Sequence, residues 1–268
     1  MPKLVIAASD VHGNVAMLDK VTEFQKSYPD AITVFGGDYV DGHKEGYEVL
    51  RRIYDMSHAH PDRVVVLRGN HEDIMLNFMN NYHDRLWLYN GGKATMKEWC
   101  RTLVGRAGHA AWMRKIILEH EAPLLRWVSS LPYTVTLGQM VFVHAGFDWK
   151  QHHPLTETSP DKMVWLREEY LYTNPDVPIF AHNPTGKVIV SGHTPTVFIH
   201  GSYEHDEEQG YPNQIADRRL PCPIKKIQYP KEATRYFIDG GNHGGDNRLG
   251  NVAVFNTEDG TLVDEYQD

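Results

Sequence analysis

The sequence lacks the features that mark secreted, membrane-spanning or disulfide-bonded proteins. It has two cysteines, Cys100 and Cys222, without CxxC spacing, so neither a disulfide framework nor a thiolate metal site is expected. No apolar run approaches the roughly 20 residues that cross a membrane, and the apolar run within residues 1–9 is too short for a signal peptide. We therefore expect a cytoplasmic protein with no membrane partner.

Positive charge is also scarce. The chain has 27 Lys and Arg against 35 Asp and Glu, for a formal net charge of −8, and the basic residues form no cluster. Because affinity for a nucleic-acid backbone comes from clustered Lys and Arg, we expect no nucleic-acid partner and disfavour a nuclease. The 41% of hydrophobic residues can build a core, and no linker or repeat interrupts the chain, so we expect one domain over residues 1–268.

Hydrophobic patterning predicts alternating strands and helices at the start of the chain. Buried strands are expected at residues 3–9, 31–35 and 63–67. Amphipathic helices are expected after Asn14 and around residues 45–56. This order favours parallel strands with helices packed outside, and the loops after the carboxyl ends of such strands meet at one edge.

The rest of the chain divides into a helical and a β-rich part. Residues 72–130 have a mostly helical pattern, and we expect the tryptophans there to lie in its core. From Tyr133 onward, two strands flank Gly138 and Gln139 like a hairpin, and several short β-rich runs follow. Polar, turn-rich residues from about 202 to 223 predict an inserted surface loop.

Polar side chains that can bind metal recur after the predicted strands, each next to glycine. They are Asp10 and His12, Asp38 and Asp41, Asn70 and His71, His144, and His193. Alone, Asp10 could cap a helix and His12 could be solvated, but chance does not readily produce five such blocks. Oxygen and imidazole ligands in this mixture suit Mn, Fe or Zn better than Ca or Mg alone.

The blocks DVHG, GDYVDG, GNHE, HAG and GHT resemble, in kind and order, the motifs of calcineurin-like metallophosphoesterases. The resemblance is specifically to the bacterial and phage branch of the phosphoprotein phosphatase family. It implies an α/β fold, a four-layer sandwich of two mixed β-sheets flanked by helices. It also implies two divalent metal ions, one bound by Asp10, His12 and Asp38, the other by Asp38, Asn70, His144 and His193.

The resemblance further implies how the site works. Two divalent ions lower the pKa of a bridging water and clamp the phosphoryl oxygens, so a metal-bridging hydroxide is the expected nucleophile. His71 is the expected general acid, with Asp41 orienting it, and a positioned acid contributes about 10²–10⁴-fold. Asn70 and Arg167, the latter in a W-x-R segment, are expected to contact the substrate phosphate. For Arg167, a surface helix arginine is the alternative.

Other positions fit the family pattern less closely. Where the family has Arg after the second Asp of GDxVDRG, this chain has Gly42, so a guanidinium that binds phosphate is missing. Arg248, in a glycine-rich loop, is a candidate replacement, with a solvated loop charge as the alternative. The segment from Asn90 to Thr95 resembles a bacterial-branch motif near the cleft, or is a plain helix-start turn. The unmatched histidines, including His243, are expected to be structural or solvated.

The sequence thus predicts a metal-dependent phosphatase. The expected substrate is a phosphomonoester, either phosphoserine or phosphothreonine of a protein or a small phosphorylated metabolite or nucleotide. The alternative within the family is hydrolysis of symmetrical dinucleoside tetraphosphates, because that activity uses the same metal core. A metal-free binding module of the same fold is disfavoured, since all six ligands and His71 are intact.

Overall fold

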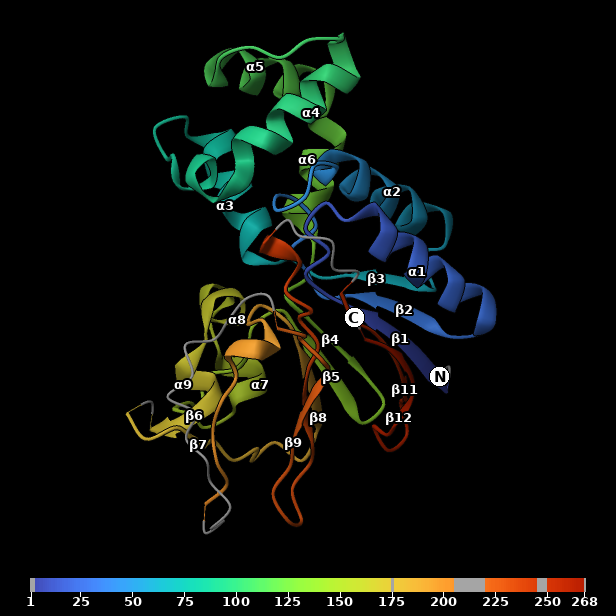
Figure 1. Cartoon of the computed structure of the whole chain (residues 1–268), viewed down its shortest axis with the longest axis vertical. Coiled ribbons are helices and arrows are strands. Elements are labelled where there is room, and N and C mark those ends of the chain that lie inside the picture. The colour runs from blue at the N-terminus through green and yellow to red at the C-terminus, as the bar shows by residue number, and fades with distance from the viewer. Residues whose placement is uncertain (1–2, 175, 205–219, 245–249, 268) are drawn as a thin grey trace.

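Two five-stranded sheets lie face to face, and helices pack on their outer faces (Figure 1). The computed structural model describes residues 3–174, 176–204, 220–244 and 250–267. Each sheet contains both parallel and antiparallel neighbours. The predicted α/β four-layer sandwich with two mixed sheets is therefore confirmed.

The first sheet holds the three predicted N-terminal strands and two strands from the end of the chain. Its order is β12-β11-β1-β2-β3, and β1, β2 and β3 run parallel. The strands are β1 (Leu4–Ala8), β2 (Ile32–Phe35), β3 (Val64–Val66), β11 (Val252–Asn256) and β12 (Leu262–Tyr266). Helix α1 (Val15–Ser27) links β1 to β2, and helix α2 (Gly46–Ala59) links β2 to β3. Both predicted helices are thus confirmed.

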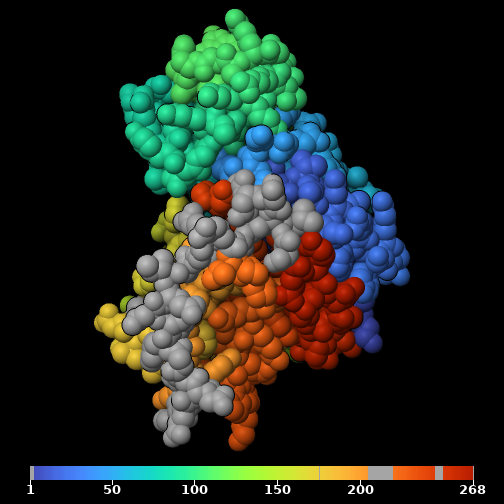
Figure 2. All heavy atoms as spheres, viewed as in Figure 1, coloured from blue at the N-terminus to red at the C-terminus, as the bar shows by residue number. Residues whose placement is uncertain are grey.

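The helical region after β3 projects at one end of the molecule, as the space-filling view shows (Figure 2). It comprises α3 (Asn70–Asn80), the short π-turn η1 (Leu88–Gly92), α4 (Lys93–Val104), α5 (Ala110–His120) and α6 (Ala122–Ser130). Trp87 and Trp99 are fully buried, whereas Trp112 and Trp127 are partly buried against the same core. The expectation that these tryptophans pack the core is confirmed.

The second sheet has the order β4-β5-β8-β10-β9. Its strands are β4 (Thr134–Leu137), β5 (Met140–Val143), β8 (Val188–Ser191), β9 (Lys225–Ile227) and β10 (Arg235–Phe237). The predicted hairpin is present, because Leu137 pairs with Met140 across the turn at Gly138 and Gln139. Short elements cover its outer face: α7 (Pro154–Glu157), α8 (Pro160–Trp165), α9 (Glu168–Leu171), β6 (Tyr172–Asn174), β7 (Ile179–Phe180) and η2 (Thr196–Phe198).

Strand β1 shows how the layers are built. Successive side chains of a strand point to opposite faces. Val5 and Ala7 therefore pack in the core between the two sheets, whereas Ile6 and Ala8 pack against the helices. Both faces of β1 are buried, which holds the loop that follows Ala8 deep in the molecule.

Two predictions fall on residues outside those described. Most of the expected surface loop at 202–223 lies there, as does Arg248. Among the described residues, no helix is both long and apolar enough to cross a lipid bilayer.

Candidate metal centre

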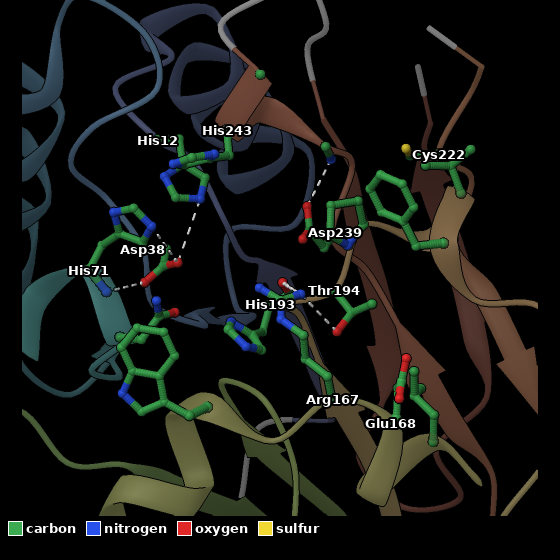
Figure 3. A pocket seen from close by; sticks show the side chains of 18 of the residues that line it. His12, Asp38, His71, Arg167, Glu168, His193, Thr194, Cys222, Asp239 and His243 are labelled. Carbon is green, nitrogen blue, oxygen red and sulfur yellow. Dashed lines mark hydrogen bonds and ion pairs between the residues drawn. The ribbon is translucent and has the colours of Figure 1, made fainter. Parts of the chain in front are cut away.

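The loops after successive strands meet at one edge of the two sheets. Asp10 and His12 follow β1, Asp38 follows β2, Asn70 begins α3, His144 follows β5, and His193 follows β8. All six side chains are buried, none more than 4% exposed. Figure 3 shows several of them pointing toward a common centre. The structure therefore brings together the six ligands that the family resemblance implies.

The backbone at this edge adopts a conformation that L-residues rarely use. Asp10, His12, Asp38, Asp41 and His193 have φ of 56°, 47°, 58°, 70° and 65°. Within the described chain, Lys231 is the one other non-glycine residue with positive φ. Such conformations cost on the order of 1–3 kcal/mol each and gather at functional sites. The strained backbone conformations are thus concentrated at the residues of this site.

Glycine permits the close approach of these loops. Gly37 has φ of 105°, and a Cβ there would lie 2.7 Å from Nδ1 of His144 and 2.8 Å from Cα of Gly69. A side chain at position 37 would push apart the loops after β2, β3 and β5. The glycine next to Asp38 is therefore required by packing.

The first group of potential ligands is Asp10, His12 and Asp38. Nδ1 of His12 donates to the carbonyl oxygen of Val40 at 3.0 Å, which leaves Nε2 to face the carboxylates. That Nε2 lies 3.5 Å from Oδ2 of Asp38 and 4.0 Å from Oδ1 of Asp10. One ligand atom from each residue lies within 4.8 Å of the others, close enough to share one cation.

The second group is Asp38, Asn70, His144 and His193. Nδ1 of His144 donates to the carbonyl oxygen of Gly36 at 2.9 Å, and its Nε2 lies 3.4 Å from Oδ2 of Asp38 and 3.0 Å from Oδ1 of Asn70. Nε2 of His193 is buried and has no hydrogen-bond partner among the described residues. Asp38 belongs to both groups, as a carboxylate that bridges two ions must.

The electrostatics of the cluster suit bound cations. Burial, with a smaller contribution from nearby Asp38, raises the pKa of Asp10 to about 6. Burial alone would lower the pKa of His144, but the carboxylates of Asp38 and Asp10 outweigh it and raise that pKa to about 10. The negative charge of the buried carboxylates is thus balanced by the protonated ring of His144. Bound divalent ions would supply positive charge at the same place. The donor set fits Mn, Fe or Zn.

His71 and Asp41 form a pair beside the cluster. Nδ1 of His71 donates to Oδ2 of Asp41 at 2.7 Å, and its Nε2 lies 4.0 Å from Oδ2 of Asp38. Burial lowers the pKa of His71, but Asp38 and Asp41 outweigh burial and raise it to about 9. This is the arrangement that a general acid requires, since a proton is held on the ring next to the reaction centre.

Sequence reasoning missed several partners of these residues. Nε1 of Trp87 donates to Oδ2 of Asp41 at 2.8 Å, so this core tryptophan also serves the site. The hydroxyl of Thr95 donates to Oδ1 of Asp41 at 2.7 Å, which favours the cleft interpretation of the segment from Asn90 to Thr95. Glu72, fully buried, accepts from the backbone N–H groups of Asp38 and two other residues. In the sequence, the one indication that Glu72 belongs to the site was its place in the GNHE block.

A pocket of about 440 Å³ opens over the cluster. Nη1 of Arg167 donates to the carbonyl oxygen of His193 at 2.8 Å and to Oγ1 of Thr194 at 3.2 Å, so this arginine lines the pocket rather than lying along a solvated helix.

His243, expected to be structural or solvated, also lines the pocket, with its ring centroid 4.8 Å from that of His12. Its exposure is in line with that expectation, whereas its position beside His12 is not marked by anything near His243 in the sequence.

Comparisons with known proteins bear on the family and the fold of this chain. The family model for calcineurin-like phosphoesterases matches residues 3–222. Similar solved structures include a proposed diadenosine tetraphosphatase, at 14% identity and a TM-score of 0.56, with 100% of this chain and 94% of that chain covered. A metallophosphoesterase from Sphaerobacter thermophilus has 14% identity, a TM-score of 0.51 and coverages of 99% and 88%. A cold-active protein-tyrosine phosphatase of a psychrophilic Shewanella has 17% identity, a TM-score of 0.56 and coverages of 98% and 80%. At these identities the structural matches support the fold alone.

Proposed function

The chain belongs to the calcineurin-like phosphoesterase family, a family of metal-dependent hydrolases, and from that premise we propose that it is a dinuclear phosphatase acting on phosphomonoesters. The observation that carries the proposal is the position of Asp38 between two groups of potential ligands. A carboxylate shared in this way could be a ligand of two neighbouring divalent ions, the arrangement used in two-metal phosphatases. In this proposal Asp10 and His12 complete one ion's ligands, and Asn70, His144 and His193 complete the other's.

The chain's own residues supply the rest of the chemistry. Divalent ions, when bound, activate water and neutralise the charge of the phosphoryl group. His71, held by Asp41, protonates the departing oxygen. Arg167 and Asn70 line the pocket and orient the phosphate, and the bonds from Arg167 to the His193 loop fix the position of its guanidinium.

The pocket supports an organic substrate larger than phosphate. Its volume of about 440 Å³ lies within the range typical of sites for small organic ligands. Leu171, Val197 and Phe198 add an apolar wall beside the polar cluster. A phosphorylated side chain of a protein, or a small phosphorylated metabolite or nucleotide, fits this combination.

A symmetrical dinucleoside tetraphosphate is the second candidate substrate. The apolar wall offers a surface for a base, and one solved structure of similar fold is a proposed diadenosine tetraphosphatase. That likeness supports the fold alone, so the two substrates must be separated by measurement.

The test compares three substrates side by side. Purified protein is stripped of metal and reloaded with Mn, Fe or Zn. It is then assayed for phosphate release from p-nitrophenyl phosphate and a phosphoserine peptide, and for ADP release from diadenosine tetraphosphate. We expect metal-dependent release from the monoesters, abolished in the matched control Asp38→Asn. Faster cleavage of the tetraphosphate would favour the second candidate, and metal binding without hydrolysis of any substrate would contradict a phosphatase.

A further inference from the structure

Position 42 could carry the arginine that the family pattern would place there only with strain. Gly42 has φ of 71°, and a Cβ on it would lie 2.9 Å from Cβ of His12 and 3.1 Å from the carbonyl oxygen of His12. The carbonyl oxygen of Asn242 would lie 3.2 Å away on another side. The turn η3 (Asn242–Gly244) therefore lies against the position from which that side chain would have started.

This turn is fixed to the metal-binding loop. Asn242 is fully buried, and its Nδ2 donates to the carbonyl oxygen of Asp10 at 3.1 Å. Its Oδ1 accepts from Nδ2 of Asn14 at 3.1 Å. The backbone N–H of Gly241 donates to Oδ1 of Asp239 at 2.8 Å. The backbone that precedes His243 is thus held in place, and Asn242 ties it to the loop after β1.

The fixed turn places His243 over the cluster. Its ring centroid lies 4.8 Å from that of His12 and 4.9 Å from that of His71. Those two residues are buried, whereas His243 is exposed and lines the pocket, next to His12 in Figure 3. One ring nitrogen from each of the three residues lies within 4.8 Å of the others.

We propose that His243 contacts the phosphate of the substrate, taking the place of the arginine side chain that Gly42 lacks. The inference rests on the proposed function and names an additional residue of that same site. An imidazole N–H donates a hydrogen bond to a phosphate oxygen, and His243 presents its ring to the pocket above the cluster. A cation held by the three imidazoles is disfavoured by the geometry, because Nε2 of His12 already faces Asp10 and Asp38.

The experiment measures phosphate affinity directly. Manganese-loaded wild type, His243→Ala and His243→Gln are titrated with inorganic phosphate by calorimetry, and KM and kcat are measured with p-nitrophenyl phosphate. We expect His243→Ala to weaken phosphate binding and raise KM by about tenfold, as the loss of one hydrogen bond to a charged group predicts, with a smaller change in kcat. His243→Gln keeps an N–H donor and should recover part of the affinity.

Controls separate this role from others. His120→Ala, at the exposed end of α5, should leave phosphate affinity unchanged. Manganese content and melting temperature of the His243 variants should match wild type. Phosphate affinity within twofold of wild type in His243→Ala, or loss of manganese from that variant, would overturn the inference. A wild type that binds manganese and phosphate yet hydrolyses no ester would instead overturn the proposed function, and the binding comparison would still decide the role of His243.

Discussion

Hydrogen bonds at the level of single residues decide which nitrogen of each imidazole faces the centre. His12 and His144 both donate Nδ1 to a backbone carbonyl oxygen, at 3.0 and 2.9 Å. Nε2 is therefore the atom turned toward the carboxylates in both. Such outer partners fix the tautomer and the ring orientation of metal-binding histidines. The two rings are thus oriented by the backbone.

The role proposed for His71 leads to a prediction about leaving groups. His71→Asn removes the proton donor but leaves all six potential metal ligands, so hydrolysis of an ester with a poor leaving group should slow by about 10²–10⁴-fold. An ester with a good leaving group, such as p-nitrophenyl phosphate, should be affected less. Manganese content by elemental analysis should stay at the wild-type level. Full activity on the poor leaving group would exclude His71 as the acid.

Thr95 offers a test of the partners of Asp41. Its hydroxyl donates to Oδ1 of Asp41 at 2.7 Å and accepts from the backbone N–H of Asp41 at 3.1 Å. Thr95→Val keeps the shape but leaves these buried groups unpaired, so the free energy of unfolding should fall by about 1–3 kcal/mol. Turnover should also fall, because Asp41 orients His71.

The matched control for that change is Thr95→Ser, which retains the hydroxyl. Thr95→Ser should recover most of the stability, measured by urea unfolding, and most of the turnover, measured by phosphate release. If Thr95→Val is as stable and active as wild type, the hydrogen bonds of Thr95 to Asp41 contribute nothing measurable.

At the level of elements, the loops after strands are held together by buried polar side chains. Both carboxylate oxygens of Glu72 are used, because they accept from the backbone N–H groups of Asp38, Tyr39 and Gly69. The start of α3 is thereby joined to the loop after β2. Burial raises the pKa of Glu72 to about 7, and these backbone donors act in the opposite direction. This junction sets the spacing between Asp38 and Asn70.

The loop between β5 and α7 is organised by Asp148, which predicts a pH dependence. Lys162, Gln151 and the backbone N–H of Lys150 donate to its carboxylate, and the bond from Lys162 leads in lowering its pKa to about 2. A lowered pKa stabilises the fold above the ordinary pKa of about 4, and that stability is lost as the pH falls through about 2.

Asp148→Asn should therefore lower the free energy of unfolding at pH 7 by about 1–2 kcal/mol, a value reduced by the solvent exposure of Lys162. Urea unfolding of metal-free protein at pH 7 and pH 3 checks this, and the gap between variant and wild type should narrow at pH 3. A gap of equal size at both values would contradict the assigned role of this carboxylate.

At the level of the whole molecule, the candidate centre lies where the two sheets meet. Asp10 and Asp38 follow strands of the first sheet, whereas His144 and His193 follow strands of the second. Ions bound by both sets would join the sheets. Metal binding should therefore stabilise the entire fold and not only the loops.

Metal removal tests that expectation. A ligand that binds the native state alone stabilises it by about 2.7 kcal/mol at one hundred times its dissociation constant. For a chain of this size, manganese should thus raise the melting temperature of the stripped protein by several degrees. Scanning calorimetry with and without manganese measures the shift, and Asp38→Asn should abolish it. If the melting temperature of the wild type does not change when manganese is added, a metal centre that joins the two sheets is contradicted.

The sequence by itself determined the elements and the candidate ligands. Buried strands, amphipathic helices and the hairpin at Gly138 are encoded by the periodicity of neighbouring residues. Each candidate ligand block is also local, since it combines a strand end, a glycine and a polar side chain. The family resemblance turned those blocks into a six-residue ligand set.

Only the tertiary structure decided which distant residues serve the site. Trp87 and Thr95 lie on the helical region yet donate to Asp41, and His243 comes from a turn more than 200 residues after His12. No local pattern encodes such pairs, because they depend on how separate elements pack. Gly42 and the turn that carries His243 are likewise neighbours in space, through a contact with Asn242 that the order of residues does not reveal.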